Sequence, residues 1–272
     1  MKRRAFTMLE MMTVLVVIAV LAGLLFPALQ LTSTASTRTH CRANLRQLAR
    51  AATQYAIGHG GRLPPGLLYG TDADALSGDV RSWDWWRRPD GTVQAGPLWA
   101  LTDRGSEVAV LRCPTAPETP ASWEGDPVTG YNYNVAFVAA EARPPTAGDA
   151  GLGAWELVVG KPNLEGLKEL TLAQCRTAGT AALFGTGGRR GGVNKFMRSP
   201  VNAGSGYDTA YAGGQSFPGG GSNVGWIDGH VSTCRTPSRG IHWDALPTWL
   251  TDSLDWPNNG FLCDDASAYD PR

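Results

Sequence analysis

The sequence predicts an α+β protein in which one long N-terminal α-helix packs on a β-rich, loop-rich globular domain. Two observations predict the helix: a nearly unbroken apolar run at residues 11–26, and apolar residues at steps of four and three from Cys41 to Tyr55. The first half is apolar enough for a membrane and the second half is amphipathic. The domain is predicted to be rich in strands and loops, because most of the 34 glycines and 18 prolines follow the helix, among short apolar runs. We therefore divide the chain into a leader (1–5), a transmembrane helix (6–29), its amphipathic continuation (30–59) and a globular domain (60–272).

The apolar segment at residues 6–29 is long enough to cross a bilayer. At about 1.5 Å per residue it would form a helix about 36 Å long. Basic residues precede it at positions 2–4, and the next basic residue is Arg38. The positive-inside rule therefore leaves the N-terminus in the cytoplasm and exports the rest of the chain.

A single acid, Glu10, stands just inside this apolar segment. A carboxylate is costly in a span that faces lipid, so it usually has a partner and a function. An ordinary signal-anchor has no reason to contain it. An ordinary secretory signal would be cleaved near residues 19–23, but the apolar run continues through residues 24–26.

The leader, Ala5 and the Phe-Thr-Met-Leu-Glu stretch at residues 6–10 resemble the prepilin signal of type IV pilins and type II secretion pseudopilins. The resemblance implies that a prepilin peptidase cuts between Ala5 and Phe6 and methylates the new amino group of Phe6. Most members have glycine where this chain has Ala5. Glu10 would then pair with the terminal amine of a neighbouring subunit, because a carboxylate and an ammonium in apolar surroundings cost less together than apart. Pro27 lies where pilin helices commonly carry a proline, and it should kink or locally open the helix.

The amphipathic half is expected to end near His59, because Gly58, Gly60 and Gly61 follow the last apolar positions. We expect His59 to cap the helix, where a cation suits the dipole, rather than to bind a metal. Strands are expected at 107–112, 131–139, 155–159, 181–185, 224–227 and 230–233. Between the last two stand Asp228 and Gly229, a dipeptide favoured by hairpin turns.

Further stretches resemble a large family of pseudopilin-like proteins, common in planctomycetes and their relatives. That family ends in a module named for a histidine, nine residues and Asp-Gly. The resemblance is carried by residues 41–48, by Leu-Arg-Cys-Pro at 111–114 and by the glycine-rich stretch at 219–231. Pro218 stands where the naming histidine would fall, so no role of that histidine carries over. A β-hairpin with its turn at Asp228 and Gly229 explains the rest of this module as a structural feature, with no catalytic or binding role.

Disulfide bonds are expected, because an exported domain meets an oxidising compartment. The chain has five cysteines, and two bridges among them allow about 15 pairings. Cys41 with Cys113 is the first candidate, because that bond would tie the helix to the β-rich domain. The other pairings stay open, and no cysteine or histidine spacing indicates structural zinc.

The composition argues against several other functions. No basic patch suggests nucleic-acid binding. We find no Gly-x-Ser-x-Gly elbow, phosphate loop or His-Glu-x-x-His motif, so we expect that the protein is not an enzyme. The glycines at 185–192 lack the lysine of a phosphate site and are interpreted as a mobile loop. Acids gather at Asp252, Asp255, Asp264, Asp265 and Asp270, either as a solvated C-terminal tail or, as an alternative, as a calcium loop.

Taken together, the sequence predicts a pilin-like or pseudopilin-like structural subunit without a cofactor. It would sit in inner-membrane lipid with an exported C-terminal domain, meet prepilin peptidase, and polymerise with copies of itself and other pilin-like subunits. An alternative is an anchored or filament-tip module that binds glycans or a secreted protein. That alternative depends on the tryptophan-rich stretch at residues 82–88, where Trp83 and Trp85 would share a strand face.

Overall fold

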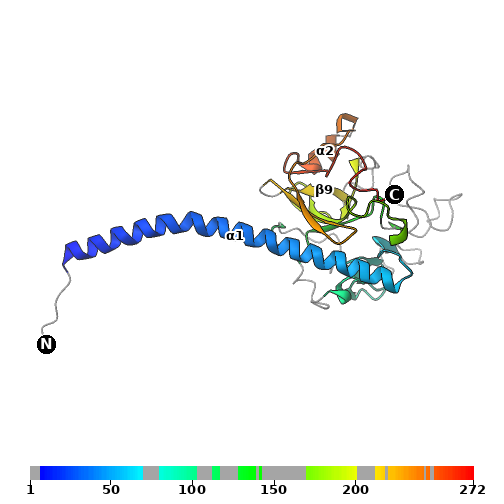
Figure 1. Ribbon diagram of the computed structural model, residues 1–272, viewed down its shortest axis with the longest axis horizontal. Coiled ribbons are helices and arrows are strands. Elements are labelled where there is room, and N and C mark those ends of the chain that lie inside the picture. Colours follow the sequence, from blue (N-terminus) through cyan, green and yellow to red (C-terminus); the bar gives the residue numbers. More distant parts are fainter. Residues whose placement is uncertain are drawn as a thin grey trace.

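A 51-residue helix, α1 (Met8–Gly58), dominates the computed structural model of the protein. Figure 1 shows it as one arched rod whose first half projects away from the domain and whose second half lies against it. This confirms the predicted helix and the α+β fold class. The structure describes residues 7–69, 80–102, 112–116, 128–138, 141–142, 170–200, 212–217, 220–241, 243–245 and 248–272.

The C-terminal end of α1 is closed by its cap residue and by two glycines. Nδ1 of His59 donates to the Tyr55 carbonyl at 2.8 Å, and the two rings stack with centroids 3.7 Å apart. The backbone N–H of Gly61 donates to the Ala56 carbonyl at 2.7 Å. Gly60 and Gly61 have φ angles of 66° and 83°, the left-handed geometry in which glycine ends helices.

The described part of the domain contains two sheets. The smaller is ordered β4-β3-β2-β1-β6, with β1 and β6 parallel and the other pairs antiparallel. Its strands are β1 (Leu67–Tyr69), β2 (Val80–Ser82), β3 (Trp85–Arg87), β4 (Val93–Ala95) and β6 (Glu141–Ala142).

The larger sheet is ordered β11-β10-β7-β5-β8-β9-β12, and β7 also pairs with β9. The strands β7, β5, β8 and β9 therefore form a closed ring. The strands are β5 (Tyr131–Asn134), β7 (Ala182–Gly188), β8 (Phe196–Met197), β9 (Ala212–Ser216), β10 (Ser222–Trp226), β11 (Val231–Cys234) and β12 (Asn259–Gly260). Short helices lie at Trp99–Leu101, Leu172–Gln174 and Trp243–Ala245, and α2 spans Thr248–Leu254.

The second half of α1 packs on β10 and β7 of the larger sheet. Gly225 of β10 faces the helix, and a Cβ there would lie 3.5 Å from the Leu45 carbonyl oxygen. Close approach of helix and sheet buries one face of the second half of α1. Its buried apolar side chains are those of Cys41, Leu45, Leu48, Ala49, Ala51, Ala52 and Ala56.

Three expectations from the sequence are wrong. The first is the length of the strand at 131–139, because β5 begins at Tyr131 as expected but ends at Asn134. The Asn134 side-chain oxygen accepts hydrogen bonds from the backbone N–H groups of Ala136 and Phe137, at 3.1 and 3.3 Å. This local turn replaces the sheet ladder and stops the strand.

The second error is the mobile loop at 185–192. Residues 185–188 lie in β7, a central strand that is buried along its whole length, and residues 189–192 form a tight turn. The glycines serve close packing, because a Cβ on Gly187 would collide with the Asn194 carbonyl oxygen and one on Gly188 with the Asn259 side chain.

The third error is the solvated C-terminal tail. Tyr269 is completely buried, and the Pro271 carbonyl accepts hydrogen bonds from the backbone N–H groups of Arg176 and Thr177. The end of the chain is therefore part of the domain, although Asp264 and Asp265 remain exposed. The expected strands at 107–112 and 155–159 lie outside the described residues, apart from Arg112, and so do Pro218 and His242.

Candidate functional site

The apolar half of α1 is the first candidate site. The segment Met8–Leu25 has a mean hydropathy of 2.5, is long and apolar enough to cross a membrane, and has none of its residues buried against the domain. Its side chains are exposed on all sides of the helix. The exposed fraction is 86% for Met8 and 70% for Leu24. Such a continuous apolar surface is stable only when lipid or other helices cover it.

Glu10 lies in the first turn of this half and forms a capping box with Thr7. Its Oε2 accepts hydrogen bonds from the backbone N–H and the hydroxyl of Thr7, both at 2.8 Å. The Thr7 hydroxyl in turn accepts from the Glu10 backbone N–H at 3.3 Å. The other carboxylate oxygen, Oε1, has no hydrogen-bond partner among the described residues, so the capped carboxylate can still accept a donor from outside the chain.

The backbone of α1 is helical through position 27. Figure 1 shows α1 as a curved but unbroken helix. A local opening at Pro27 stays a prediction.

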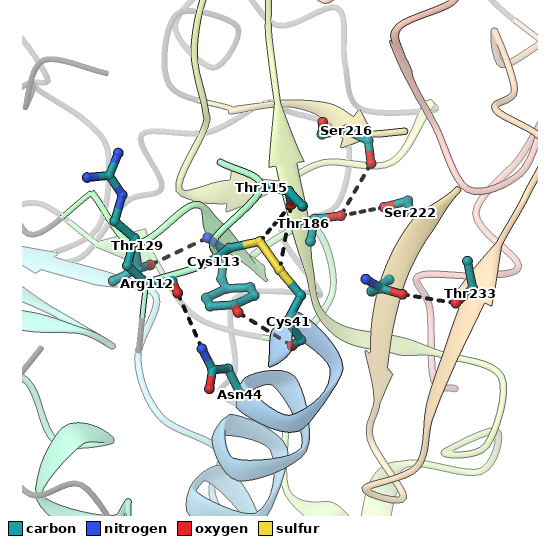
Figure 2. The surroundings of a disulfide bond; sticks show 12 residues. Cys41, Asn44, Arg112, Cys113, Thr115, Thr129, Thr186, Ser216, Ser222 and Thr233 are labelled. Atoms are coloured by element: carbon teal, nitrogen blue, oxygen red, sulfur yellow. Dashed lines mark hydrogen bonds between the residues drawn. A yellow bond between two sulfur atoms is a disulfide. The ribbon is translucent and has the colours of Figure 1, made fainter. Parts of the chain in front are cut away.

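The junction of α1 with the domain contains a disulfide bond between Cys41 and Cys113, with Cα atoms 5.2 Å apart. Figure 2 shows Thr115 beside both sulfur atoms, with its hydroxyl 3.0 Å from the sulfur of Cys113. Next to the bond, the side-chain amide of Asn44 donates to the Arg112 carbonyl at 3.3 Å. The Tyr131 hydroxyl donates to the Cys41 carbonyl at 3.4 Å. The covalent bond and these hydrogen bonds hold the helix to the domain.

A second candidate site is a shallow groove of about 540 Å³ between the exposed face of α1 and the turn that joins β10 to β11. Asp228 and Gly229 form this turn, with Gly229 at a φ of 89°. Nδ1 of His230 lies 2.6 Å from Oδ1 of Asp228, and the His230 ring stacks on Trp226. The lining residues are Arg46, Arg50, Thr53, Gln54, Ile57, Asp228, Gly229 and His230.

The groove has a cationic side. Within the part of the chain that the structure describes, neither Arg46 nor Arg50 has a hydrogen-bond or ion-pair partner. Free guanidinium groups beside a concave surface favour an anionic ligand, because arginine binds carboxylates with two parallel hydrogen bonds. Neither Arg46 nor Arg50 is among the site residues predicted from the sequence. Their spacing of four residues was the signal that they share one helix face.

The predicted site residues thus lie in three separate places. Glu10 is near the free end of α1, Cys41 and Cys113 are at the junction, and Asp228 and Gly229 border the groove. Ala5 and Phe6 lie outside the described residues. Among the described residues, no three His, Cys, Asp or Glu side chains are grouped so as to hold a metal ion.

The tryptophans proposed for glycan stacking do not offer a free face. Trp83 and Trp85 are buried, and Trp83 packs against Trp99, Tyr133 and Phe184. Trp83 precedes β3 rather than lying in it. Trp86 is half-buried, and the guanidinium groups of Arg81 and Arg88 lie 4.5 and 4.8 Å from its ring centroid. The tryptophan-rich stretch is therefore mainly structural.

Comparison with protein families gives one match, to the prokaryotic N-terminal methylation motif at residues 1–26. Comparisons with curated proteins and with solved structures found no significant match. The motif covers the leader and the exposed apolar half of α1, including Glu10. It implies processing by prepilin peptidase and assembly with other pilin subunits. The chain therefore carries a prepilin-type N-terminal motif at residues 1–26, which supports a precursor of the type IV pilin-like kind.

Proposed function

We propose that this protein is a structural subunit that polymerises through residues 6–29 into a type II secretion or type IV pilus-like filament. The chain would be inserted in the inner membrane, cleaved after Ala5, and assembled with its domain in the periplasm or at the cell surface. Residues 30–59 would continue the helix and carry the domain of residues 60–272. Its work would be assembly and mechanics rather than catalysis.

One observation carries this proposal: none of the residues of Met8–Leu25 is buried against the described part of the domain, yet this segment contains a carboxylate with an open oxygen. Lipid covers apolar side chains but offers no donor to Glu10. A bundle of equivalent helices offers both apolar cover and the amine of a processed neighbour. The match to the methylation motif at residues 1–26 supports such a processed amine.

The test replaces Glu10 with Ala and with Gln in the full-length chain, expressed in its own host. Two readouts are taken from the same cells: cleavage after Ala5, by mass spectrometry, and the fraction of the chain in sheared filaments. Leaving one partner of a buried charge pair alone costs about 3–5 kcal/mol. We therefore expect cleaved protein in the membrane and a fall in filament incorporation of more than about tenfold.

Thr7→Val is the matched control, because it removes the hydroxyl from the capping box and leaves the Glu10 carboxylate in place. Normal incorporation of Thr7→Val beside loss in Glu10→Gln would assign the effect to the charge rather than to the helix cap. Normal incorporation of both Glu10 variants would refute assembly through this carboxylate.

A second candidate function, an anchored or filament-tip binding module, is favoured by the groove of Arg46 and Arg50. Its ligand would be anionic: an acidic segment of a secreted protein or a carboxylate-bearing glycan. Arg46→Glu with Arg50→Glu should abolish binding of such ligands and leave filament incorporation unchanged. Loss of incorporation with no ligand found would instead assign the groove to subunit contacts.

A further inference from the structure

We propose that Cys234 and Cys263 form a second disulfide bond, which fastens the C-terminal segment of the domain to the β10–β11 hairpin. Both are free thiols in the structure, together with Cys175. The inference depends on the proposed function only for export to an oxidising compartment. The arrangement of the two thiols is independent of it.

The two thiols share one neighbourhood, beside Leu262. Cys234 ends β11, and its thiol donates to the Leu262 carbonyl at 3.8 Å. Leu262 directly precedes Cys263, so this contact brings the sulfur of Cys234 next to the backbone of Cys263. The backbone N–H of Leu262 donates to the Tyr269 hydroxyl at 2.8 Å, which helps to hold Leu262 in place.

Both side chains also pack against the same apolar cluster, which is separate from the main core. The cluster consists of Phe137, Ala182, Met197, Val224 and Tyr269. Burial raises the pKa of the Tyr269 hydroxyl far above its usual value, and charge on either Cys263 or Cys234 would raise it further. Both thiols therefore lie within electrostatic range of one buried atom.

Cys175 is a poor partner for either of them. It packs with Leu172 and Ala178 against the main core, and its thiol donates to the Thr171 carbonyl at 3.6 Å. Once Cys41 and Cys113 are joined, three pairings of the remaining thiols are open. Of these three thiols, only Cys234 and Cys263 pack against the same cluster.

Neither thiol would lose a strong hydrogen bond on forming the disulfide. Cys263 donates to the Asp265 carbonyl at 3.3 Å and accepts from the Ala268 N–H at 3.4 Å. Cys234 gives up only long contacts to Leu262 and Thr236, at 3.8 and 3.7 Å. Thiols are weak hydrogen-bond donors, so these contacts do not oppose formation of the disulfide.

The chemistry is thiol–disulfide exchange with an external disulfide, either a disulfide oxidoreductase or glutathione disulfide. One cysteine, as thiolate, attacks the external disulfide and releases one thiol, and the second cysteine then displaces the other half. Two thiol protons and two electrons leave the protein, and the external disulfide is reduced to two thiols. Burial raises the pKa of both Cys234 and Cys263, so the exchange should be slow at neutral pH and faster in mild alkali.

The test uses the purified full-length chain in detergent. The protein is reduced so mildly that the Cys41–Cys113 bond stays closed, and it is then incubated with glutathione disulfide. Open thiols are alkylated and the protein is digested with trypsin. Trypsin cuts after Arg235 and Arg239, so the two cysteines fall in different peptides. We expect a linked pair of peptides containing Cys234 and Cys263, and alkylation at Cys175 alone.

Two variants act as controls. Cys175→Ser should leave the linked peptides unchanged, and Cys263→Ser should leave Cys234 alkylated. Retention of the Cys41–Cys113 bond in each variant shows that the domain is folded. Alkylation of both Cys234 and Cys263 after oxidation, or linkage of either to Cys175, would overturn the inference.

The same alkylation, applied directly to cells, separates this inference from the proposed function. A mature chain that begins with N-methylated Phe6 but has Cys234 and Cys263 alkylated would refute the disulfide and leave the filament proposal intact. A linked pair in the purified chain, with no processing at Ala5 in cells, would refute the filament proposal and leave the disulfide intact.

Discussion

Cys41 of α1 and Cys113, which lies 72 positions later in the chain, are joined by a disulfide at the point where the helix meets the domain. Both residues are buried in the main core. The bond closes a loop that contains β1 to β4 of the smaller sheet. It therefore links the helix covalently to the part of the domain that it carries.

Removing this bond with the double variant Cys41→Ala and Cys113→Ala should lower the free energy of unfolding by about 4 kcal/mol, because a long loop regains its entropy in the unfolded chain. Urea unfolding in mild detergent, followed by tryptophan fluorescence, measures the loss, since all ten tryptophans lie beyond residue 60. Cys175→Ala, which removes a half-buried free thiol, is the control and should cost far less. Equal stability of the double variant and the parent would show that the bond is not structural.

The ion pair between Lys195 and Asp84 joins the two sheets. Nζ of Lys195 lies 2.9 Å from Oδ2 of Asp84, whose carboxylate is fully buried, and 5.4 Å from the centroid of the Trp85 ring. Lys195→Met should destabilise the domain by about 3–5 kcal/mol, because it leaves a buried charge without its cation.

The exposed pair of Arg190 and Asp255, at 3.4 Å, is the comparison. Arg190→Met should change the free energy of unfolding by less than about 1 kcal/mol, because surface ion pairs contribute little. Urea unfolding measures both variants. Similar losses of unfolding free energy in Lys195→Met and Arg190→Met would contradict the expectation that the buried ion pair contributes more to stability.

The glycines of β7 are closely packed, so adding a side chain there should destabilise the domain. Gly187→Ala should cost about 1–3 kcal/mol or more, because the added methyl group meets the rigid backbone of Asn194. Gly58→Ala is the matched change at the end of α1, where nothing lies within 4 Å of the added carbon. It should be neutral or stabilise by about 0.5–1 kcal/mol, since alanine is the better helix former. The midpoint of thermal unfolding should therefore fall for Gly187→Ala and should not fall for Gly58→Ala. A Gly187→Ala protein as stable as the parent would refute the close packing.

Asp265 should titrate at unusually low pH. The hydroxyl of Ser267 and its backbone N–H donate to Oδ1 of Asp265 at 2.6 and 2.9 Å, and these hydrogen bonds lower the pKa of Asp265. Because the folded-state pKa is lowered, the stabilisation is full above the ordinary carboxyl pKa of about 3.9 and is lost as pH falls through the lower folded value.

Ser267→Ala should raise the pKa of Asp265, which carbon-detected NMR titration of the side-chain carboxyl measures. Asp90 is an internal reference, because Thr92 lowers its pKa through the same arrangement and is unchanged in this variant. A shift of Asp90 together with Asp265 would indicate a global change rather than loss of one hydrogen bond.

The sequence predicted the helix well because its signals are local. The apolar run, the stripe from Cys41 to Tyr55 and the glycines after Gly58 all act within a few residues along the chain. The structure places the ends of α1 at Met8 and Gly58, within two residues of the expected bounds.

The sheet was less predictable, because its determinants are contacts between distant segments. The side-chain amide of Asn134 donates to the carbonyls of Ala182 and Tyr269, at 2.7 and 2.8 Å, and so ties β5 to β7 and to the end of the chain. Gln215 is also completely buried. Buried amides and strand glycines have the composition of loops, so periodicity alone assigns them wrongly.

The central claim concerns the N-terminus, and mass spectrometry of the mature chain from its own host tests it most directly. The account predicts loss of residues 1–5 and a first residue of N-methylated Phe6, at the head of the intact helix that carries Glu10. A mature chain beginning at Ala22 or Gly23 would show an ordinary secretory signal and contradict the account, and so would a chain that retains its leader.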